Sequence, residues 1–225
     1  MRGDALYEFS RVHEIPIVTI ASLVKILRSE VATTNRTNVE SVKTLHWAKL
    51  PRQNSSSSHQ QNWQIATMSG RGGVDHALLK YGSFDTNQKV LLRIHSECLT
   101  GDVLGSLRCD CGSQLQRAME KIEAHGSGLV IYLRDQEGRG IGLSEKIRAY
   151  ELQDQGLDTV EANLALGHDV DEREFADAVE ILNELKIRDV RLLTNNPMKL
   201  QTLIESGISA TAEDLHGEVN KFKEK

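Results

Sequence analysis

The chain contains one unbroken apolar stretch, Leu129-Val130-Ile131-Tyr132-Leu133, that decides its fold class. A strand that is apolar at every position, rather than at alternate positions, is typical of a sheet covered on both faces. The residues before it have the spacing of an amphipathic helix, opened by Ser113 and closed near Gly126, whose apolar face is formed by Leu115, Ala118, Met119 and Ile122. Together these patterns predict a helix that packs against a buried strand.

The same alternation continues on both sides of this stretch. Residues 175–185 and 200–204 carry apolar side chains at helical spacing, and residues 190–194 between them have the composition of a strand. Upstream, residues 77–81 and 90–94 also have the composition of strands. We therefore expect an α/β (mixed α+β) fold in which helices cover one sheet, with the candidate site at a strand end.

The composition divides the chain into three parts. Residues 1–28 include a β-rich run followed by apolar residues at helical spacing. Residues 29–62 are poor in apolar side chains and contain a serine run, which is typical of a linker or a mobile loop. Ordered structure is expected to resume at about residue 63, so that residues 63–225 form the main domain.

The overall composition excludes several classes of function. A chain of 225 residues with 39% hydrophobic content can form one large domain with a core. Its formal net charge of −5 gives no reason to expect binding to nucleic acid or to an anionic membrane surface. The first residues lack the apolar segment of a signal peptide, and no apolar run is long enough to cross a bilayer. We expect a reduced, soluble, cytoplasmic protein, or an organellar one if a targeting segment is missing from this sequence.

Three cysteines mark the candidate site. Cys98, Cys109 and Cys111 are the only cysteines of the chain and lie close together in the sequence. An odd number of cysteines cannot pair off as disulfides. Three thiolates suit zinc, and three protein ligands are typical of a catalytic zinc, which keeps its fourth position for water. The alternative is that three buried thiols act as small apolar side chains, which fits poorly with their polar neighbours.

His95 is a candidate fourth ligand, and such a site would be closed and structural. The other interpretations of His95 are a contact with a substrate and a hydrogen bond in the core. His95-Ser96-Glu97 also fits one half of the signature of zinc-dependent nucleobase deaminases. The other half requires Pro-Cys-x-x-Cys, whereas this chain has Arg-Cys-Asp-Cys, so a deaminase is the weaker alternative.

A glycine-rich loop directly follows the apolar strand. It reads Asp135-Gln-Glu-Gly-Arg-Gly-Ile-Gly142 and matches neither a P-loop nor a dinucleotide fingerprint. Glycines let backbone amides approach a ligand, and α/β proteins bind ligands at the C-terminal ends of strands. Glu137 and Arg139 add a carboxylate suited to a guanine edge and a guanidinium suited to a phosphate. A plain glycine turn is the alternative.

Two further segments carry basic residues. Thr194-Asn-Asn-Pro-Met-Lys199 follows a predicted strand and opens a predicted helix, so it is either a phosphate site or an ordinary cap by Asn195 or Asn196 before Pro197. Capping does not explain Lys199. By composition alone, Lys146 and Arg148 are typical of a solvent-exposed face.

Six strings of the sequence form one constellation. They are Arg93-Ile-His-Ser-Glu-Cys98-Leu-Thr-Gly-Asp, Leu107-Arg-Cys109-Asp-Cys111-Gly, Gln136-Glu-Gly-Arg139-Gly-Ile-Gly, Lys146-Ile-Arg-Ala-Tyr150, Asp158-Thr159-Val-Glu-Ala-Asn163 and Leu192-Leu-Thr-Asn-Asn-Pro-Met-Lys199. In this order they resemble the GTP cyclohydrolase II family, and the resemblance is continuous from about Asp75 to Gly207. Members of that family open the imidazole ring of GTP and release formate and pyrophosphate, as the first step of riboflavin synthesis.

The resemblance implies roles for individual residues. It implies that Cys98, Cys109 and Cys111 are the zinc ligands. It implies that Asp171 is a proton acceptor, that Arg173 is the nucleophile toward the α-phosphorus and that Tyr150 lies near the base. Contacts with GTP are implied for Arg93, Ile94, His95, Ser96, Glu97, Gln114, Glu137, Gly138, Arg139, Thr159, Thr194 and Lys199.

The implied chemistry suits these residues. Zinc lowers the pKa of its bound water toward neutrality, and the resulting hydroxide can attack the imidazole carbon of a purine. We expect one zinc ion per chain, and a Mg²⁺ ion bound mainly by phosphate oxygens and water. GTP is the expected small-molecule partner, and the family resemblance implies a homodimer.

The chain departs from the family pattern near both ends. The usual Leu-Pro-Thr-x-x-Gly-x-Phe segment is replaced after Leu50-Pro51 by a polar run, and the sequence after Gly207 does not match the closing segment of the family. Residues 8–28 resemble the end of 3,4-dihydroxy-2-butanone 4-phosphate synthase, so residues 1–28 are interpreted as a remnant without synthase activity. The alternative function is therefore a zinc-stabilised, GTP-binding relative with little or no turnover.

Overall fold

The computed structural model describes residues 4–13, 45–52 and 62–215. Helix α1 (Asp4–His13) belongs to a separate unit, residues 1–44, and contains a contact between the rings of Phe9 and His13 with centroids 4.3 Å apart. The strand and helix expected within residues 15–28 lie outside the described residues, as do residues 29–44 and 53–61 of the expected linker. Within the described part of the chain, no helix has both the length and the apolar content needed to cross a bilayer.

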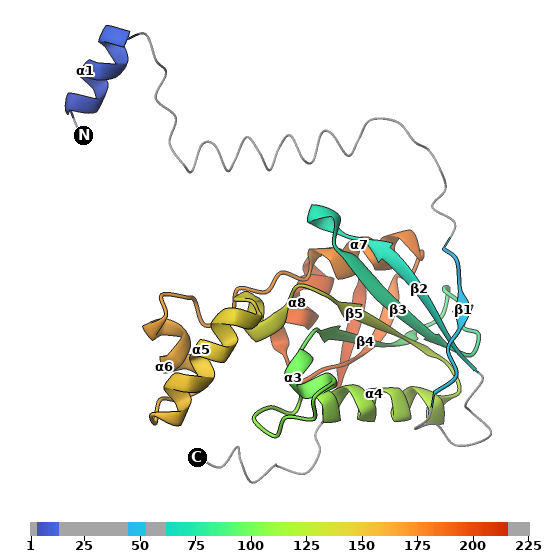
Figure 1. Ribbon diagram of the computed structural model, residues 1–225. Helices are drawn as coiled ribbons and strands as arrows, with labels where there is room; N and C mark the ends of the chain where they lie inside the picture. The colour runs from blue at the N-terminus through green and yellow to red at the C-terminus, as the bar shows by residue number, and fades with distance from the viewer. Residues whose placement is uncertain (1–3, 14–44, 53–61, 216–225) are drawn as a thin grey trace. The chain divides into compact units, whose positions relative to one another are not determined.

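The unit that follows, from Leu45 onward, is built on one mixed sheet (Figure 1). Its described strands are β1 (Ala48–Lys49), β2 (Trp63–Ser69), β3 (Asp75–Tyr81), β4 (Val90–Ser96), β5 (Gly128–Leu133), β6 (Asp189–Leu193) and β7 (Ser209–Glu213). They lie side by side in the order β1-β2-β3-β5-β4-β6-β7. Neighbours from β1 to β5 are antiparallel, and neighbours from β5 to β7 are parallel. The expected α/β (mixed α+β) fold, built on one sheet, is confirmed.

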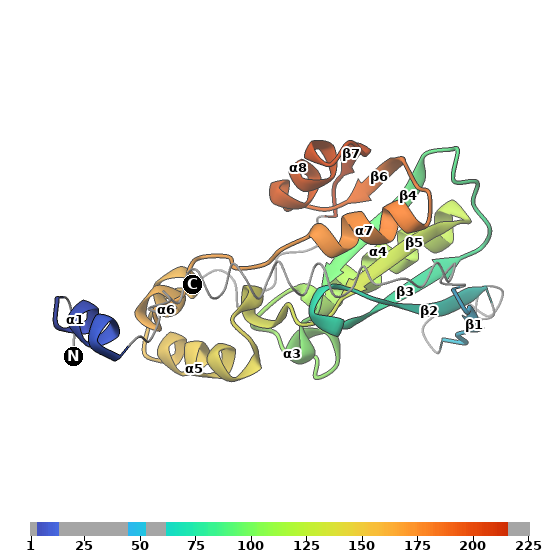
Figure 2. The same cartoon turned by 90° about the horizontal axis from the view of Figure 1, so that it is seen from above.

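Helices connect and cover these strands. They are α3 (Leu99–Asp102), α4 (Cys111–His125), α5 (Leu143–Asp154), α6 (Thr159–Ala165), α7 (Ala176–Glu184) and α8 (Pro197–Glu205), with the short 3-10 turns η1 (Arg71–Gly73) and η2 (Glu137–Gly140). Figure 2 shows α7 and α8 beside the parallel half of the sheet. Helices α5 and α6 contact each other and lie side by side in both views.

Two hydrophobic cores lie against the sheet. On one side, Met119 and Ile122 of α4 pack with Val130 of β5 and with Trp63 of β2. In the other core, apolar residues of α7 and α8 pack with alternating residues of the same strands, such as Ile131. Because helices cover both faces, β5 is buried along almost its whole length. This arrangement is the one predicted from the apolar stretch at residues 129–133.

The predicted ends of two helices are close to the observed ones. Helix α4 begins at Cys111, two residues before the expected start at Ser113, and ends at His125. The next residue, Gly126, caps the helix, because its left-handed φ of 90° lets its N–H bond back to the last turn. At α8, Asn196 accepts a hydrogen bond from the N–H of Met198 at 2.9 Å, and Pro197 occupies the first helical position. The predicted capping of α8 is confirmed.

The linker predicted over residues 29–62 is too long at its C-terminal end. Ala48 and Lys49 form the edge strand β1, which pairs with β2. Leu45 and Trp47 pack against the core that contains α7, and Leu50 packs against the core that contains α4. A two-residue edge strand has no periodicity of its own, so its pairing with β2 cannot be recognised from composition.

The order of the strands determines where a ligand can bind. The chain leaves β4 for β5 on one side and later returns to β6 on the other side of β4. In open α/β sheets, a crevice forms at the C-terminal ends of the strands where the order reverses in this way. The residues that follow β4 and β6 at this point are Glu97, Cys98 and Thr194.

Candidate functional site

A cavity of about 380 Å³ lies at the C-terminal ends of β4 and β6 and reaches α5 and α6. Most of the residues singled out by the sequence line it, although they come from distant parts of the chain. They are Arg93, Ser96, Glu97, Cys98, Cys109, Cys111, Gln114, Gly138, Arg139, Tyr150, Thr159, Arg173, Thr194 and Lys199. The expected site residues that do not line it are Ile94, His95, Glu137 and Asp171.

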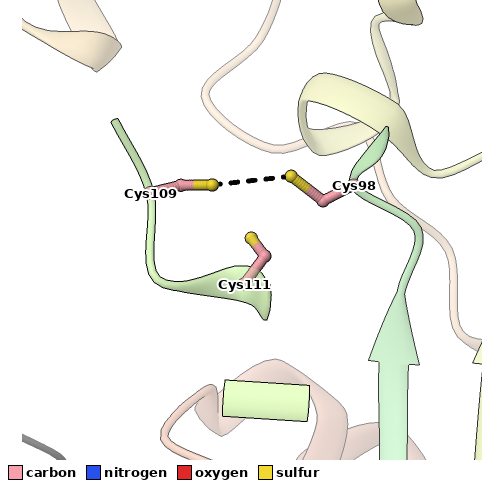
Figure 3. A group of neighbouring side chains, drawn as sticks. All are labelled: Cys98, Cys109 and Cys111. Carbon is pink, nitrogen blue, oxygen red and sulfur yellow. Dashed lines mark hydrogen bonds between the residues drawn. The ribbon is translucent and has the colours of Figure 1, made fainter. Parts of the chain in front are cut away.

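The three thiols form one cluster in this cavity (Figure 3). Cys98 follows β4 and precedes α3, Cys111 is the first residue of α4, and Cys109 lies in the loop before it. Their sulfur atoms all lie within 4.8 Å of one another, and those of Cys98 and Cys109 are 3.5 Å apart. Zinc–sulfur bonds of about 2.3 Å place tetrahedral sulfur ligands roughly 3.8 Å apart. The spacing therefore suits a single metal ion.

Gly101 keeps the space between the sulfur atoms open. A Cβ atom at this position would lie 2.7 Å from Sγ of Cys109 and 3.1 Å from Sγ of Cys98. Any side chain at residue 101 would therefore enter the space around which the thiols gather. The donor atoms and the open space between them both fit a thiophilic metal ion.

Protons are distributed unequally over the cluster. Hydrogen bonds with Cys109 and Cys111 lower the pKa of Cys98 far below its ordinary value. Hydrogen bonds with Cys109 and Cys98, together with burial, raise the pKa of Cys111. Each further thiolate would add negative charge to the same small space. A bound cation supplies the missing positive charge, since metal binding and thiol deprotonation are coupled.

Lys146 places a positive charge next to Cys98. Its Nζ donates a hydrogen bond to Sγ of Cys98 at 3.1 Å and another to the carboxylate of Glu137. Burial lowers the pKa of Lys146, but these two bonds outweigh burial and raise the pKa above its ordinary value. The interpretation of Lys146 as solvent-exposed is wrong, because its exposed fraction is 8%. Arg148, which pairs with Glu145, is exposed as expected.

Glu137 uses both of its carboxylate oxygens inside the protein. Oε1 accepts from Lys146, and Oε2 accepts from the backbone N–H of Leu99 at 2.6 Å. The carboxylate is therefore bound to the segment that carries Cys98. Its contact with a guanine edge stays a prediction, and that contact would require Glu137 to release one of these two donors.

His95 lies in a buried polar network outside the thiol cluster. Its Nε2 is 3.0 Å from Oδ2 of Asp102, and its Nδ1 is 3.3 Å from Nη2 of Arg93. Asp102 also accepts hydrogen bonds from the hydroxyl of Tyr132 at 2.8 Å and from the N–H of Cys98 at 3.1 Å. Both ring nitrogens of His95 therefore have partners other than a metal, and the network fixes the backbone of Cys98.

Among the basic side chains that line the cavity, those of Arg93 and Arg173 act on the charge of Lys199. Lys199 is 4% exposed, and its Nζ donates to the carbonyl oxygen of Ile94 at 3.0 Å. Burial and the nearby charges of Arg93 and Arg173 hold the pKa of Lys199 well below its ordinary value. Burial also lowers the pKa of Arg93 to about 10. An anion between these groups would relieve their mutual repulsion, so this part of the cavity is suited to phosphates.

Asp171 and Arg173 form a two-point ion pair. Nη2 of Arg173 lies 2.5 Å from Oδ2 of Asp171, and Nε donates to Oδ1 at 2.8 Å. Burial would raise the pKa of Asp171, but its bonds with Arg173 outweigh burial and lower the pKa. The pair places the guanidinium in the cavity wall and keeps the carboxylate ionised behind it.

The remaining wall comes from η2, α5 and α6. The hydroxyl of Tyr150 lies 3.1 Å from Oγ1 of Thr100, and the guanidinium of Arg108 lies over the Tyr150 ring at 4.8 Å from its centroid. In η2, both Gly138 and Arg139 adopt left-handed φ angles, of 62° and 64°. A left-handed arginine is uncommon and strained, and such strain concentrates at functional sites. This loop is therefore more than a plain glycine turn.

A family model described as GTP cyclohydrolase II matches residues 54–213, which include every residue that lines the cavity. The chain belongs to the GTP cyclohydrolase II family. The family expected from the six sequence strings is confirmed.

Curated relatives agree with this GTP cyclohydrolase II assignment. GTP cyclohydrolase-2 of Neisseria meningitidis serogroup B is 57% identical over 150 residues, which are 65% of this chain and 76% of the relative. GTP cyclohydrolase-2 of Buchnera aphidicola is 56% identical over 139 residues, 62% of this chain and 71% of the relative. Riboflavin biosynthesis protein RibBA of Salinispora tropica is 44% identical over 212 residues, 94% of this chain but only 50% of the relative. The RibBA match thus extends beyond the span of the family model and is consistent with an N-terminal segment of another riboflavin enzyme.

Two buried polar residues that line the cavity were not predicted as site residues of this GTP cyclohydrolase II homologue. They are Lys146 and Asn163. Asn163 is only 3% exposed, and its side-chain amide has no hydrogen-bond partner among the described residues. Each lies four residues from an expected site residue on the same helix, Lys146 before Tyr150 and Asn163 after Thr159. Residues at this spacing share a helix face, so the spacing is the signal that could have found them.

Proposed function

We propose that this protein is an active GTP cyclohydrolase that opens the imidazole ring of GTP and releases formate and pyrophosphate, in riboflavin biosynthesis. Membership of the family and 57% identity to a protein named GTP cyclohydrolase-2 support the reaction. The observation that carries the proposal is that a metal-competent thiol cluster and the basic side chains of Arg93, Arg173 and Lys199 line one cavity. A single nucleotide could then react at its base and at its phosphates in the same site.

We infer that the metal ion is zinc, with Cys98, Cys109 and Cys111 as its ligands. Thiolate ligands with the spacing seen here favour zinc over hard cations such as Mg²⁺. Zinc in such a site supplies hydroxide near neutral pH by lowering the pKa of bound water. A Mg²⁺ ion would enter with the triphosphate, because it is held mainly by phosphate oxygens and water.

We infer that the phosphates lie against Arg93, Arg173 and Lys199. A phosphate is a stronger partner for a guanidinium than one carboxylate when it is surrounded by several cations. It would therefore compete with Asp171 for Arg173. Once released from Arg173, the carboxylate of Asp171 would be free to accept a proton, which supports its assignment as the proton acceptor.

Asn163 is proposed as a residue that recognises the base. Its carboxamide can accept a hydrogen bond from a ring N–H of guanine and donate one to the keto oxygen. This amide lines the cavity and has no hydrogen-bond partner among the described residues, so it can bind a ligand without first releasing a protein partner. Tyr150 and Thr159, on the same side of the cavity, are proposed as the neighbouring contacts.

The decisive experiment measures products from purified protein supplied with GTP, zinc and Mg²⁺. We expect formate and pyrophosphate in equal amounts. The Cys109→Ser variant should lose bound zinc and formate release, whereas Arg173→Ala should keep its zinc and lose pyrophosphate release. Tight binding of GTP with neither product would refute the proposal in favour of a binding protein, and ammonia in place of formate would indicate a deaminase.

A homodimer is proposed on the basis of exposed apolar side chains. Leu99, Val103, Leu104 and Leu107 are all exposed in the segment between β4 and α4. Contact with a second copy would remove this apolar area from water. Analytical ultracentrifugation tests the assembly, and a monomer at micromolar concentration would contradict it.

The cytoplasmic location and the synthase remnant at residues 1–28 stay predictions.

A further inference from the structure

Lys146 is a buried cation that donates one of its hydrogen bonds to the thiol cluster. Its Nζ lies 3.1 Å from Sγ of Cys98 and forms an ion pair with Glu137. The ring centroid of Tyr150 is 5.6 Å from the same atom. Side-chain exposure is 10% for Lys146 and 8% for Glu137, so water screens this charge only weakly.

Glu137 connects the lysine to the backbone next to Cys98. One of its oxygens accepts from Lys146 and the other from the N–H of Leu99, the residue after Cys98. Cys98 is thus held at two points, at its sulfur by Lys146 and at the following peptide by Glu137. Cys109 and Cys111 have no comparable cationic donor among the hydrogen bonds of the described residues.

The charges explain what such a donor can do. Three thiolates carry one more negative charge than a divalent cation neutralises, and sulfur donates electron density strongly to the metal. A hydrogen bond from an ammonium group withdraws part of that density from the sulfur. Donors that contact metal ligands in this way usually tune the site and improve metal affinity.

We propose that Lys146, held by Glu137, is a positioning residue of the metal centre that fixes the sulfur of Cys98 by a hydrogen bond and reduces its electron donation to the metal. This inference rests on the proposed thiolate metal site but not on turnover. A merely structural lysine would hold α5 against the segment after β4 and would leave the electronic properties of the sulfur unchanged. The two roles therefore differ in a spectroscopic property of the metal–sulfur bond.

The test uses Lys146→Met in the full chain, with Arg148→Met as the matched control because it removes one positive charge from an exposed position of the same helix. Zinc affinity is measured by competition with a chelator. The sulfur-to-metal charge-transfer band is recorded after substitution with Co²⁺. For Lys146→Met we expect roughly a 10- to 100-fold loss of zinc affinity and a shift of the band to longer wavelength. Arg148→Met should match the unmodified protein in both measurements.

Glu137→Gln provides the second measurement. Without the competing carboxylate, Lys146 donates more strongly to Cys98, so the band should move to shorter wavelength, opposite to Lys146→Met. Unchanged zinc affinity and an unchanged band in folded Lys146→Met would overturn the proposal. If Lys146→Met does not fold, Glu137→Gln decides: a shift to shorter wavelength supports the proposal, and no shift or the opposite shift overturns it. GTP is absent from these measurements, so a failure of ring opening leaves their outcome intact.

Discussion

Substituting Gly101 by alanine gives a sharp test of the metal centre. Gly101 lies inside α3, where alanine ordinarily stabilises a helix by about 0.5–1 kcal/mol relative to glycine. In this chain the same change should be harmful, because the added methyl group points into the space between the sulfur atoms. The sign of the effect therefore depends on the thiol cluster and not on helix propensity.

The size of the effect follows from the two distances. The new Cβ would lie 2.7 Å from Sγ of Cys109 and 3.1 Å from Sγ of Cys98. Ordinary contacts are roughly 3.5–4.0 Å, so the sulfur of Cys109 must move by about 1 Å and that of Cys98 by about 0.5 Å. Metal sites tolerate deviations of only about 0.2 Å in ligand distance. We expect zinc affinity to fall by at least about 100-fold, the upper end of losses seen when a partner of a ligand is removed.

The assay combines bound zinc with folding. Elemental analysis after dialysis, chelator competition and thermal melting are compared among the unmodified protein, Gly101→Ala and Val103→Ala. Val103 ends the same helix and is 70% exposed, so its variant should keep its zinc. A Gly101→Ala protein that is folded and binds one zinc ion per chain with unchanged affinity would refute the assignment of the space between the thiols as the metal position.

Three further predictions concern other parts of the molecule. Burial would raise the pKa of Asp177, but its bonds with Arg71 and His76 outweigh burial and lower the pKa below 3.8. Because Asp177→Asn weakens these bonds, it should cost about 1–3 kcal/mol of unfolding free energy near neutral pH. The difference in stability between the two proteins should disappear as the pH falls below 3.8, because Asp177 is then protonated. An equal loss of stability near neutral pH and below pH 3.8, measured by urea unfolding, contradicts this prediction. Because the pKa of Lys199 is lowered in the free protein, GTP binding should take up protons at pH values between that lowered pKa and the ordinary value of 10.5. Calorimetry in buffers of different ionisation enthalpy should show this uptake reduced in Lys199→Met, and equal uptake counts against a phosphate next to Lys199. Asn163→Leu should raise KM for GTP about tenfold, as expected for one lost buried hydrogen bond, and an unchanged KM would remove Asn163 from base recognition.

The sequence predicts those elements whose apolar residues face a core. Strand β5 and helices α4 and α7 were found in this way, because their buried faces consist of apolar side chains. Helix α5 was missed, since its buried positions are Lys146 and Ala149 and it therefore has no apolar stripe. Strand β2 was not assigned either, because its mixed composition is recognisable as a strand only through its pairing with β3.

The same distinction applies to the site. The thiols could be found because cysteine is scarce in the chain and its chemistry is specific. Gly101 could not, since its importance depends on the distance of an absent Cβ from two sulfur atoms. For His95, residue type alone left three interpretations open. Only the positions of Asp102 and Arg93 show that both ring nitrogens have partners within the protein.

The crowding of positive charge around Lys199 has a consequence for the lifetime of the protein. Repulsion among buried cations makes the empty fold less stable than the fold with an anion bound, so ligand binding and folding are linked. A ligand at 100 times its Kd stabilises the fold by about 2.7 kcal/mol. Cells that are rich in nucleotide would therefore retain more of this protein against proteolysis than starved cells, and its steady-state level would follow the supply of its own substrate.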